Sequence, residues 1–142
     1  MRLAVVFGTV LALALASTSS GARLDTVTFH ASLRGSAEVP KGDPDGGGTA
    51  VVTIRGPKVC WNLRPTGIGT PIAAHIHKGK AGVAGPVAFP FGKTYTARGC
   101  ATTTLELATS LEDRLQTNAA AYYVNIHTRA YKGGAVRGQL RR

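Results

Sequence analysis

Hydrophobic and polar side chains alternate along most of the chain after residue 25. Between residues 26 and 33, for example, every second side chain is apolar, which predicts a strand with one buried face. The same pattern predicts further strands over 49–55, 58–63, 71–77, 122–128 and 135–140. Apolar residues within 83–91 and β-branched residues over 102–107 predict two shorter ones.

Glycine and proline mark the connections between these segments. Gly56-Pro57 predicts a tight hairpin turn, and the glycine-rich stretch 35–48 predicts a loop. The one helix signal is the stretch 109–112, Thr-Ser-Leu-Glu, which has the spacing of a capping box and predicts a short helix near 110–118. We therefore expect an all-β fold, an antiparallel β-sandwich or flattened barrel with one short helix.

The first 22 residues break this alternation. Arg2 precedes an apolar run from Leu3 to Ala16, in which Thr9 is the one polar residue, followed by small residues, and this pattern is typical of a cleaved signal peptide. The run is shorter than the roughly 20 apolar residues that a membrane span needs, and no later stretch approaches that length. We therefore expect residues 1–22 to be removed and residues 23–142 to form one domain, secreted to the extracellular space, the periplasm or the cell envelope.

The chain is basic, with 17 lysines and arginines against 7 aspartates and glutamates. Cleavage after residue 22 removes one arginine, which leaves 16 basic and 7 acidic side chains and a net charge of +9. Such a charge attracts small anions or acidic polymers. The basic residues are dispersed and the aromatic residues are few, so we do not expect nucleic-acid binding. The sequence also lacks the motifs of glycosidases, serine hydrolases and nucleotide-binding enzymes.

Two cysteines, Cys60 and Cys100, follow the signal segment. In an exported protein we expect a disulfide between them, because such proteins fold in an oxidising compartment. The bond would close a loop of about 40 residues and stabilise the fold by about 3 to 4 kcal/mol in the chain-entropy picture. The alternative is a pair of thiolate metal ligands, although the chain has no Cys-x-x-Cys spacing.

Three of the four histidines follow an apolar residue and precede a basic, glycine-containing turn. The alternation places His75 and His77 on the side of their strand away from the core, and His127 has the same orientation in its own strand. Imidazoles at positions i and i+2 of a strand are about 6.6 Å apart and can turn onto one ion, which a third imidazole from a neighbouring strand would complete. Such a set suits copper above zinc, with iron as a further alternative, and leaves a coordination position open. The competing interpretation is a solvated surface pair.

Two further residues face the same side as these histidines. Arg137 lies on a strand that we expect to pair with the His127 strand, where a guanidinium would attract a small anion; the alternative is an ordinary surface arginine. Asn125 shares the side of His127 and could hydrogen-bond to a metal ligand. The weaker candidates are Glu38, Tyr131 and, at a solvent-facing strand position, His30.

Five stretches of the sequence resemble a known family. They are Phe29–Pro40, Ala74–Gly79, Ala81–Val87, Tyr123–Thr128 and Gly134–Leu140. These motifs closely resemble the CHRD domain, the module named after chordin, and they extend over nearly the whole of residues 23–142. The resemblance implies a single extracellular β-sandwich domain, and the family carries no established reaction.

The chain has a more distant resemblance to copper/zinc superoxide dismutase, a Greek-key β-barrel. The His-x-His copper ligands of that family look like His75 and His77, its late copper ligand looks like His127, and its anion-guiding arginine looks like Arg137. No histidine between His77 and His127 corresponds to the ligand that bridges copper and zinc, and the zinc ligand cluster is absent. The disulfide of that family also links different parts of the chain. The resemblance thus implies a flattened, superoxide-dismutase-like Greek-key fold with a copper-only site.

Two functions are therefore expected. The first is a secreted protein that binds one copper ion through three histidines and whose candidate reaction is the disproportionation of superoxide, a small anion that Arg137 and the positive net charge would attract. Copper storage or delivery differs from it only in lacking turnover. The second is a non-catalytic extracellular module that binds a protein or an acidic glycan.

Overall fold

The computed structural model describes residues 24–142, and the expected signal peptide, residues 1–22, lies outside this range. Within it, eight strands form one sheet. The strands are β1 (Val27–Arg34), β2 (Gly47–Arg55), β3 (Lys58–Thr66), β4 (Pro71–Lys78), β5 (Val87–Pro90), β6 (Arg98–Thr102), β7 (Tyr122–Thr128) and β8 (Val136–Gln139). A single α-helix of the described residues, α1, spans Leu105–Asn118, and 3-10 turns cover Gly35–Ala37 and Ala119–Ala121.

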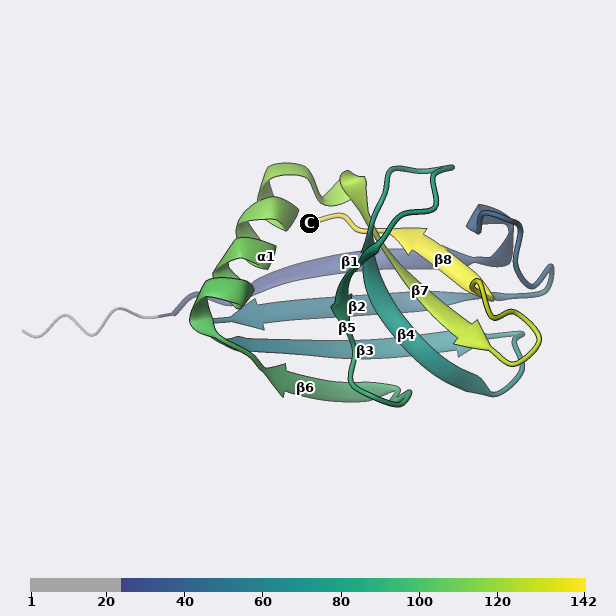
Figure 1. The fold of residues 1–142 in the computed structure, drawn as a ribbon, viewed down its shortest axis with the longest axis horizontal. Helices are drawn as coiled ribbons and strands as arrows, with labels where there is room; N and C mark the ends of the chain where they lie inside the picture. Colours follow the sequence, from purple (N-terminus) through teal and green to yellow (C-terminus); the bar gives the residue numbers. More distant parts are fainter. Residues whose placement is uncertain (1–23) are drawn as a thin grey trace, which may run out of the picture.

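The strands are hydrogen-bonded in the order β5-β4-β7-β8-β1-β2-β3-β6, and every neighbouring pair is antiparallel. The sheet curls into a half-barrel, in which β4 and β7 pass in front of β2 and β3 (Figure 1). The hairpin predicted at Gly56-Pro57 is present between β2 and β3. The expected all-β class, an antiparallel sandwich or barrel with one short helix, is therefore confirmed.

The edge strands β5 and β6 are joined by the connecting segment 91–97, which runs across the open side of the half-barrel. The amide of Tyr95 donates a hydrogen bond of 3.2 Å to a carbonyl of β4, and the carbonyl of Ala97 accepts one of 2.7 Å from an amide of β3. Irregular backbone thus bridges the two sides of the sheet.

The inner face of the curled sheet forms the hydrophobic core, and most of its side chains are those that the alternation predicts. In β1 every second side chain from Val27 to Leu33 is buried. Ile72 is an exception: it was expected on the core face but is 41 % exposed. The reason is a break in the register of β4 against β7 between Pro71 and Ala73, which interrupts the period of two at the start of the strand.

Helix α1 lies across one end of the half-barrel (Figure 1). Ala108, Leu111 and Leu115 recur at helical spacing, and their side chains are buried in the same core as the strands. The helix ends at Asn118, as predicted. No helix within residues 24–142 has the length and apolar character needed to cross a membrane.

The start of α1 differs from the sequence prediction. The spacing at 109–112 predicted a later start, and the β-branched residues predicted a strand over 102–107, whereas the helix begins at Leu105. The side chain of Thr104 accepts a hydrogen bond of 3.2 Å from the amide of Leu107 and caps the helix. The strand prediction is wrong because the threonines of this stretch end β6 and supply the cap instead of continuing the sheet.

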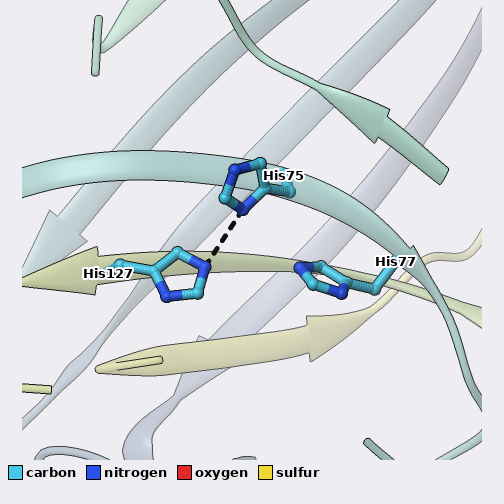
Figure 2. A group of neighbouring side chains, drawn as sticks. All are labelled: His75, His77 and His127. Carbon is cyan, nitrogen blue, oxygen red and sulfur yellow. Dashed lines mark hydrogen bonds between the residues drawn. The ribbon is translucent and has the colours of Figure 1, made fainter. Parts of the chain in front are cut away.

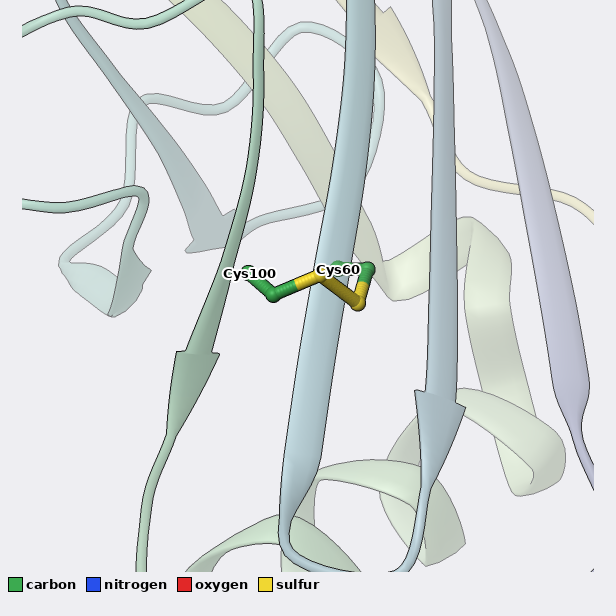
Figure 3. Close-up of a disulfide and its surroundings, with 2 residues drawn as sticks. All are labelled: Cys60 and Cys100. Carbon is green, nitrogen blue, oxygen red and sulfur yellow. A yellow bond between two sulfur atoms is a disulfide. The ribbon is translucent and has the colours of Figure 1, made fainter.

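The expected disulfide between Cys60 and Cys100 is present and links β3 to β6 (Figure 3). The two cysteines are directly opposite each other in the antiparallel pair. The alternative of two thiolate metal ligands is therefore wrong. The bond fastens the edge strand β6 and joins residues 40 positions apart, with β4 and β5 between them.

Candidate metal centre

The pairing of β4 with β7 brings three histidines together. His75 and His77 are two residues apart on β4, and His127 on β7 is two residues from the position directly opposite His75. The neighbouring residues Ala74 and Ile76 are 5 % and 0 % exposed and point into the core. The histidines therefore leave the sheet on its outer face, as the alternation predicts, and diagonal neighbours on one face can touch.

Nitrogen atoms of the three rings converge on one point (Figure 2). His75 Nδ1 and His127 Nε2 are 3.0 Å apart. One ring nitrogen from each of the three histidines, including His77, lies within 4.8 Å of the others, and all three side chains are half-buried. Two imidazole nitrogens bound to one ion at about 2.0 to 2.1 Å are separated by about 3 Å. The cluster could therefore hold a metal ion.

Two backbone carbonyls fix which nitrogen of each ring carries a hydrogen. His77 Nδ1 lies 2.8 Å from the carbonyl oxygen of Gly85, and His127 Nδ1 lies 2.9 Å from that of Lys132. A carbonyl only accepts, so each Nδ1 donates its hydrogen and each Nε2 keeps a lone pair. The Nε2 of His77 is buried and has no hydrogen-bond partner among the described residues. Contacts of this kind orient metal-ligating histidines in other proteins.

Burial and mutual proximity favour the uncharged form of His75 and His77. Burial, followed by the nearby rings of His127 and His77, lowers the pKa of His75 from 6.5 to about 4. Burial is also the largest cause that lowers the pKa of His77; His127 and Arg137 add to it, and the hydrogen bond to Gly85 opposes it. The neutral imidazole is the form that binds a metal, so protons compete only weakly with a metal at neutral pH.

Three imidazole nitrogens are a donor set of intermediate softness, compatible with copper, zinc and iron. Three protein ligands leave a coordination position for water or a small molecule, which is the property of catalytic and exchangeable sites. The arrangement therefore fits one transition-metal ion with an open position.

Arg137 lies beside this cluster, directly opposite Asn125 in the pairing of β8 with β7. Its side chain is 1 % exposed, so the alternative of an ordinary surface arginine is wrong. The reason is the loop 79–86 between β4 and β5, called here the covering loop, which lies over the outer face of the sheet at this point. The guanidinium donates hydrogen bonds of 2.8 Å to the carbonyls of Val83 and Lys80 in that loop.

Asn125 and Glu38 extend the buried polar region next to the histidines. Asn125 is directly opposite His75, is 1 % exposed, and its side chain interacts with both His77 and Glu38. Glu38 is 5 % exposed, and burial raises its pKa to about 7 although Arg137 and Asn125 act in the opposite direction. Within the described residues, one side-chain oxygen of each lacks a hydrogen-bond partner. Both candidates from the sequence therefore lie near the cluster.

The other two candidates lie elsewhere. His30 is exposed on β1, as expected, and its backbone pairs with that of Arg141. Tyr131 lies in the turn between β7 and β8, where its carbonyl accepts a hydrogen bond from Gly134. In the described part of the chain, neither is a member of the histidine cluster.

Two residues near the cluster were not singled out from the sequence. The ring of Tyr123 stacks on that of His77, with centroids 4.9 Å apart and planes 8° apart, and the guanidinium of Arg137 lies 3.4 Å from the Tyr123 ring centroid. Gln139 accepts hydrogen bonds from Arg137. The period of two could have identified both, because Tyr123 shares a face with Asn125, and Gln139 with Arg137.

The model of one protein family, described as the CHRD domain, matches residues 29–140. This range contains the three histidines, Arg137 and both cysteines. No curated protein and no solved structure matches the chain.

Proposed function

We propose that this chain, which belongs to the CHRD domain family, is a secreted domain that binds one copper ion through His75, His77 and His127. The ligand atoms are Nδ1 of His75 and Nε2 of His77 and His127. The disulfide and the signal-like residues 1–22 support a location outside the cytoplasm.

One observation carries the proposal: one ring nitrogen of each histidine converges on the same point, while Nδ1 of His77 and of His127 already donates to a backbone carbonyl. In the metal-free protein His75 Nδ1 donates to His127 Nε2, and a bound ion would replace that hydrogen, with His75 then protonated at Nε2. A solvated surface pair would not require this fixing of both rings. The buried, unpartnered Nε2 of His77 costs about 1 to 3 kcal/mol as an unsatisfied acceptor within the described structure, and a bound ion would remove that cost.

Copper is proposed over zinc and iron because Cu²⁺ stands highest in the affinity order of the divalent first-row metals for nitrogen ligands. Bound copper would supply one-electron chemistry, and the reaction that we propose is the disproportionation of two superoxide ions, with two protons from the solvent, to one dioxygen and one hydrogen peroxide. Lys78, at the end of β4, and Lys80, in the covering loop, are exposed and would attract the anion. Arg137 would act on it through its field, since its guanidinium is bonded to carbonyls.

The test is the copper content of the exported protein after loading with Cu²⁺ and dialysis, compared between wild type, His127→Ala and the control His30→Ala. We expect about one copper per chain in the wild type and in the control, because His30 is remote on β1, and loss of stoichiometric copper in His127→Ala. The same three proteins would then be assayed for removal of superoxide.

The outcomes separate the parts of the proposal. A wild-type protein without stoichiometric metal under copper-replete conditions would contradict metal binding altogether. Retention of stoichiometric copper by His127→Ala would contradict the assigned ligand set. Copper binding without superoxide removal would contradict turnover and leave storage or delivery as the function.

A second candidate function is the binding of an acidic glycan without catalysis. A cavity of about 530 Å³ lies next to the covering loop and is lined by the exposed basic residues Arg34 and Lys41. Retention on an anionic column such as heparin, lost in Arg34→Gln with Lys41→Gln but unchanged in His127→Ala, would support it. Equal retention of the wild type, the Arg34→Gln with Lys41→Gln variant and His127→Ala would contradict it.

A further inference from the structure

One buried side chain, Arg137, fastens the covering loop to the sheet. Its Nη1 donates to the carbonyl of Val83 and its Nη2 to the carbonyl of Lys80, each at 2.8 Å. The two carbonyls are three residues apart in the loop. A planar guanidinium is suited to such a pair, because its donors point along fixed directions to two acceptors at once.

Gln139, two residues further along β8, orients this guanidinium. Its Oε1 accepts hydrogen bonds from Nε and Nη2 of Arg137, at 3.3 and 3.0 Å. Its Nε2 donates to the carbonyl of Gly79, at 2.9 Å, and to that of Ala120, at 2.7 Å. Gln139 therefore connects Arg137 to the first residue of the covering loop and to the turn that follows α1.

The other end of the covering loop holds His77. The carbonyl of Gly85 accepts the hydrogen of His77 Nδ1 at 2.8 Å, and the amide of Gly85 donates to the hydroxyl of Tyr123 at 3.2 Å. Tyr123 in turn stacks on the His77 ring and contacts the guanidinium of Arg137. Arg137 is thus connected to His77 by two routes, through the loop backbone and through the Tyr123 ring.

We propose that Arg137 is a positioning residue for the metal site: by fastening the covering loop it keeps the Gly85 carbonyl on His77 Nδ1 and so presents His77 Nε2 to the ion. The effect on the metal rests on the proposed function, whereas the effect on the His77 ring concerns the metal-free protein as well. This role depends on the hydrogen-bonding geometry of the Arg137 guanidinium and not on its charge alone. A lysine would keep the positive charge, but its single ammonium lacks the planar fork that matches two carbonyls and a stacked ring.

The test compares wild type with Arg137→Lys, with Gln139→Ala and with the control Arg98→Lys. Arg98 is matched to Arg137 because its Nε also donates to a side-chain amide oxygen, that of Asn62, but it is exposed on the remote edge strand β6. In the metal-free proteins, ¹⁵N NMR of the imidazoles reports which nitrogen of His77 carries the hydrogen, and amide exchange reports the opening of the covering loop. In loaded proteins, competition with a chelator reports the affinity for Cu²⁺.

We expect the wild type and Arg98→Lys to have His77 protonated at Nδ1 and the loop amides protected. In Arg137→Lys the two tautomers should mix, the loop amides should exchange faster, and Cu²⁺ affinity should fall by about 10- to 100-fold, the usual effect of removing a group that orients a ligand. Gln139→Ala should shift the same readouts in the same direction, and it serves as the test if Arg137→Lys does not fold.

Wild-type tautomer, loop protection and affinity in a folded Arg137→Lys protein would overturn the proposal, even if its melting temperature were lower, since that result would describe a merely structural arginine. A wild type that binds no copper would defeat the proposed function instead. In that case the tautomer and exchange comparison would still decide whether Arg137 positions His77.

Discussion

A neighbour determines which nitrogen of each imidazole carries the hydrogen in the metal-free cluster. Carbonyls of the covering loop and of the β7–β8 turn accept the Nδ1 hydrogens of His77 and His127, and His127 Nε2 accepts that of His75. The ligand set therefore mixes the nitrogen nearer the backbone in one ring with the farther nitrogen in two. The protonation of these rings can be followed residue by residue.

The pKa of His75 gives the first prediction. Its folded value of about 4 lies below the ordinary 6.5, so between these values the unfolded chain binds more protons and the contribution of this ring to stability is lost as the pH falls. In an NMR titration of the metal-free protein we expect the His75 resonances to shift with a midpoint of about 4. A midpoint at or above 6.5 would mean that the ring is solvated, as in the surface-pair alternative.

Glu38 gives a prediction of opposite sign. Burial raises its pKa from 4.5 to about 7, so its contribution to stability is present below pH 4.5 and is lost as the pH rises through 7. The glutamine in Glu38→Gln cannot ionise. The free energy of unfolding of this variant relative to the wild type should therefore rise by on the order of 1 to 2 kcal/mol from pH 5 to pH 8. Urea unfolding at the two pH values measures this, with the exposed Glu106→Gln as control. A difference that does not change with pH would contradict it.

The sequence predicted which face of a strand a single residue lies on, but not how deeply its side chain is buried. The period of two assigned Arg137 to the outer side of its strand, which is correct, yet that side is covered by a loop. Loops have no periodicity, so the sequence could not show that residues 79–86 fold back over β8. Tyr123 was not recognised as a neighbour of His77, although its face was known, because it lies opposite His77 only through the pairing of β4 with β7.

At the scale of elements, β8 can lie close to β1 because Gly138 has no side chain. A Cβ atom on Gly138 would lie 2.2 Å from the backbone carbonyl oxygen of Ser32 in β1. Backbone cannot move aside as a flexible side chain can, so any larger residue at position 138 would push β8 away from β1. It would also move the adjacent Arg137 away from the carbonyls to which it donates.

Gly138→Ala should therefore lower the free energy of unfolding by about 1 to 3 kcal/mol, the usual cost of overpacking, and weaken copper binding with it. Gly133→Ala is the matched control, since an added Cβ there meets no atom of residues 24–142 within 4 Å. Urea unfolding of the two variants tests the prediction, and equal stabilities would contradict the close approach of the two strands.

Elements with a strong period were predictable, whereas their partners were predictable only where a short turn joins two strands, as between β2 and β3 and between β7 and β8. The strand 122–128 was predicted with its observed bounds, because alternation and β-branched residues agree there. The helix start was missed because Thr104 forms the cap and threonine favours strands as well. That β4 pairs with β7, which assembles the histidines, depends on tertiary packing between segments far apart in the chain and is not encoded in either segment alone.

At the scale of the whole molecule, the disulfide and the histidine cluster lie in different parts of the sheet. The bond connects β3 to β6, whereas the ligands lie on β4 and β7. We therefore expect Cys60→Ser with Cys100→Ser to lower the free energy of unfolding by about 3 to 4 kcal/mol without changing the copper stoichiometry of the folded protein. Urea unfolding measures the stability and metal analysis measures the copper content. Loss of copper from a folded variant would show that the disulfide and the histidine cluster are coupled.

His75 and His127, whose nitrogens are 3.0 Å apart, are 52 positions apart along the chain. Before the sheet forms, the chain can offer an ion only the neighbouring pair on β4, so the complete ligand set exists in the folded domain alone. If the chain is exported as proposed and crosses the membrane unfolded, it folds in the destination compartment. The metal would then be chosen from the supply of the destination compartment, and export itself would act as the filter that decides which ion the protein receives.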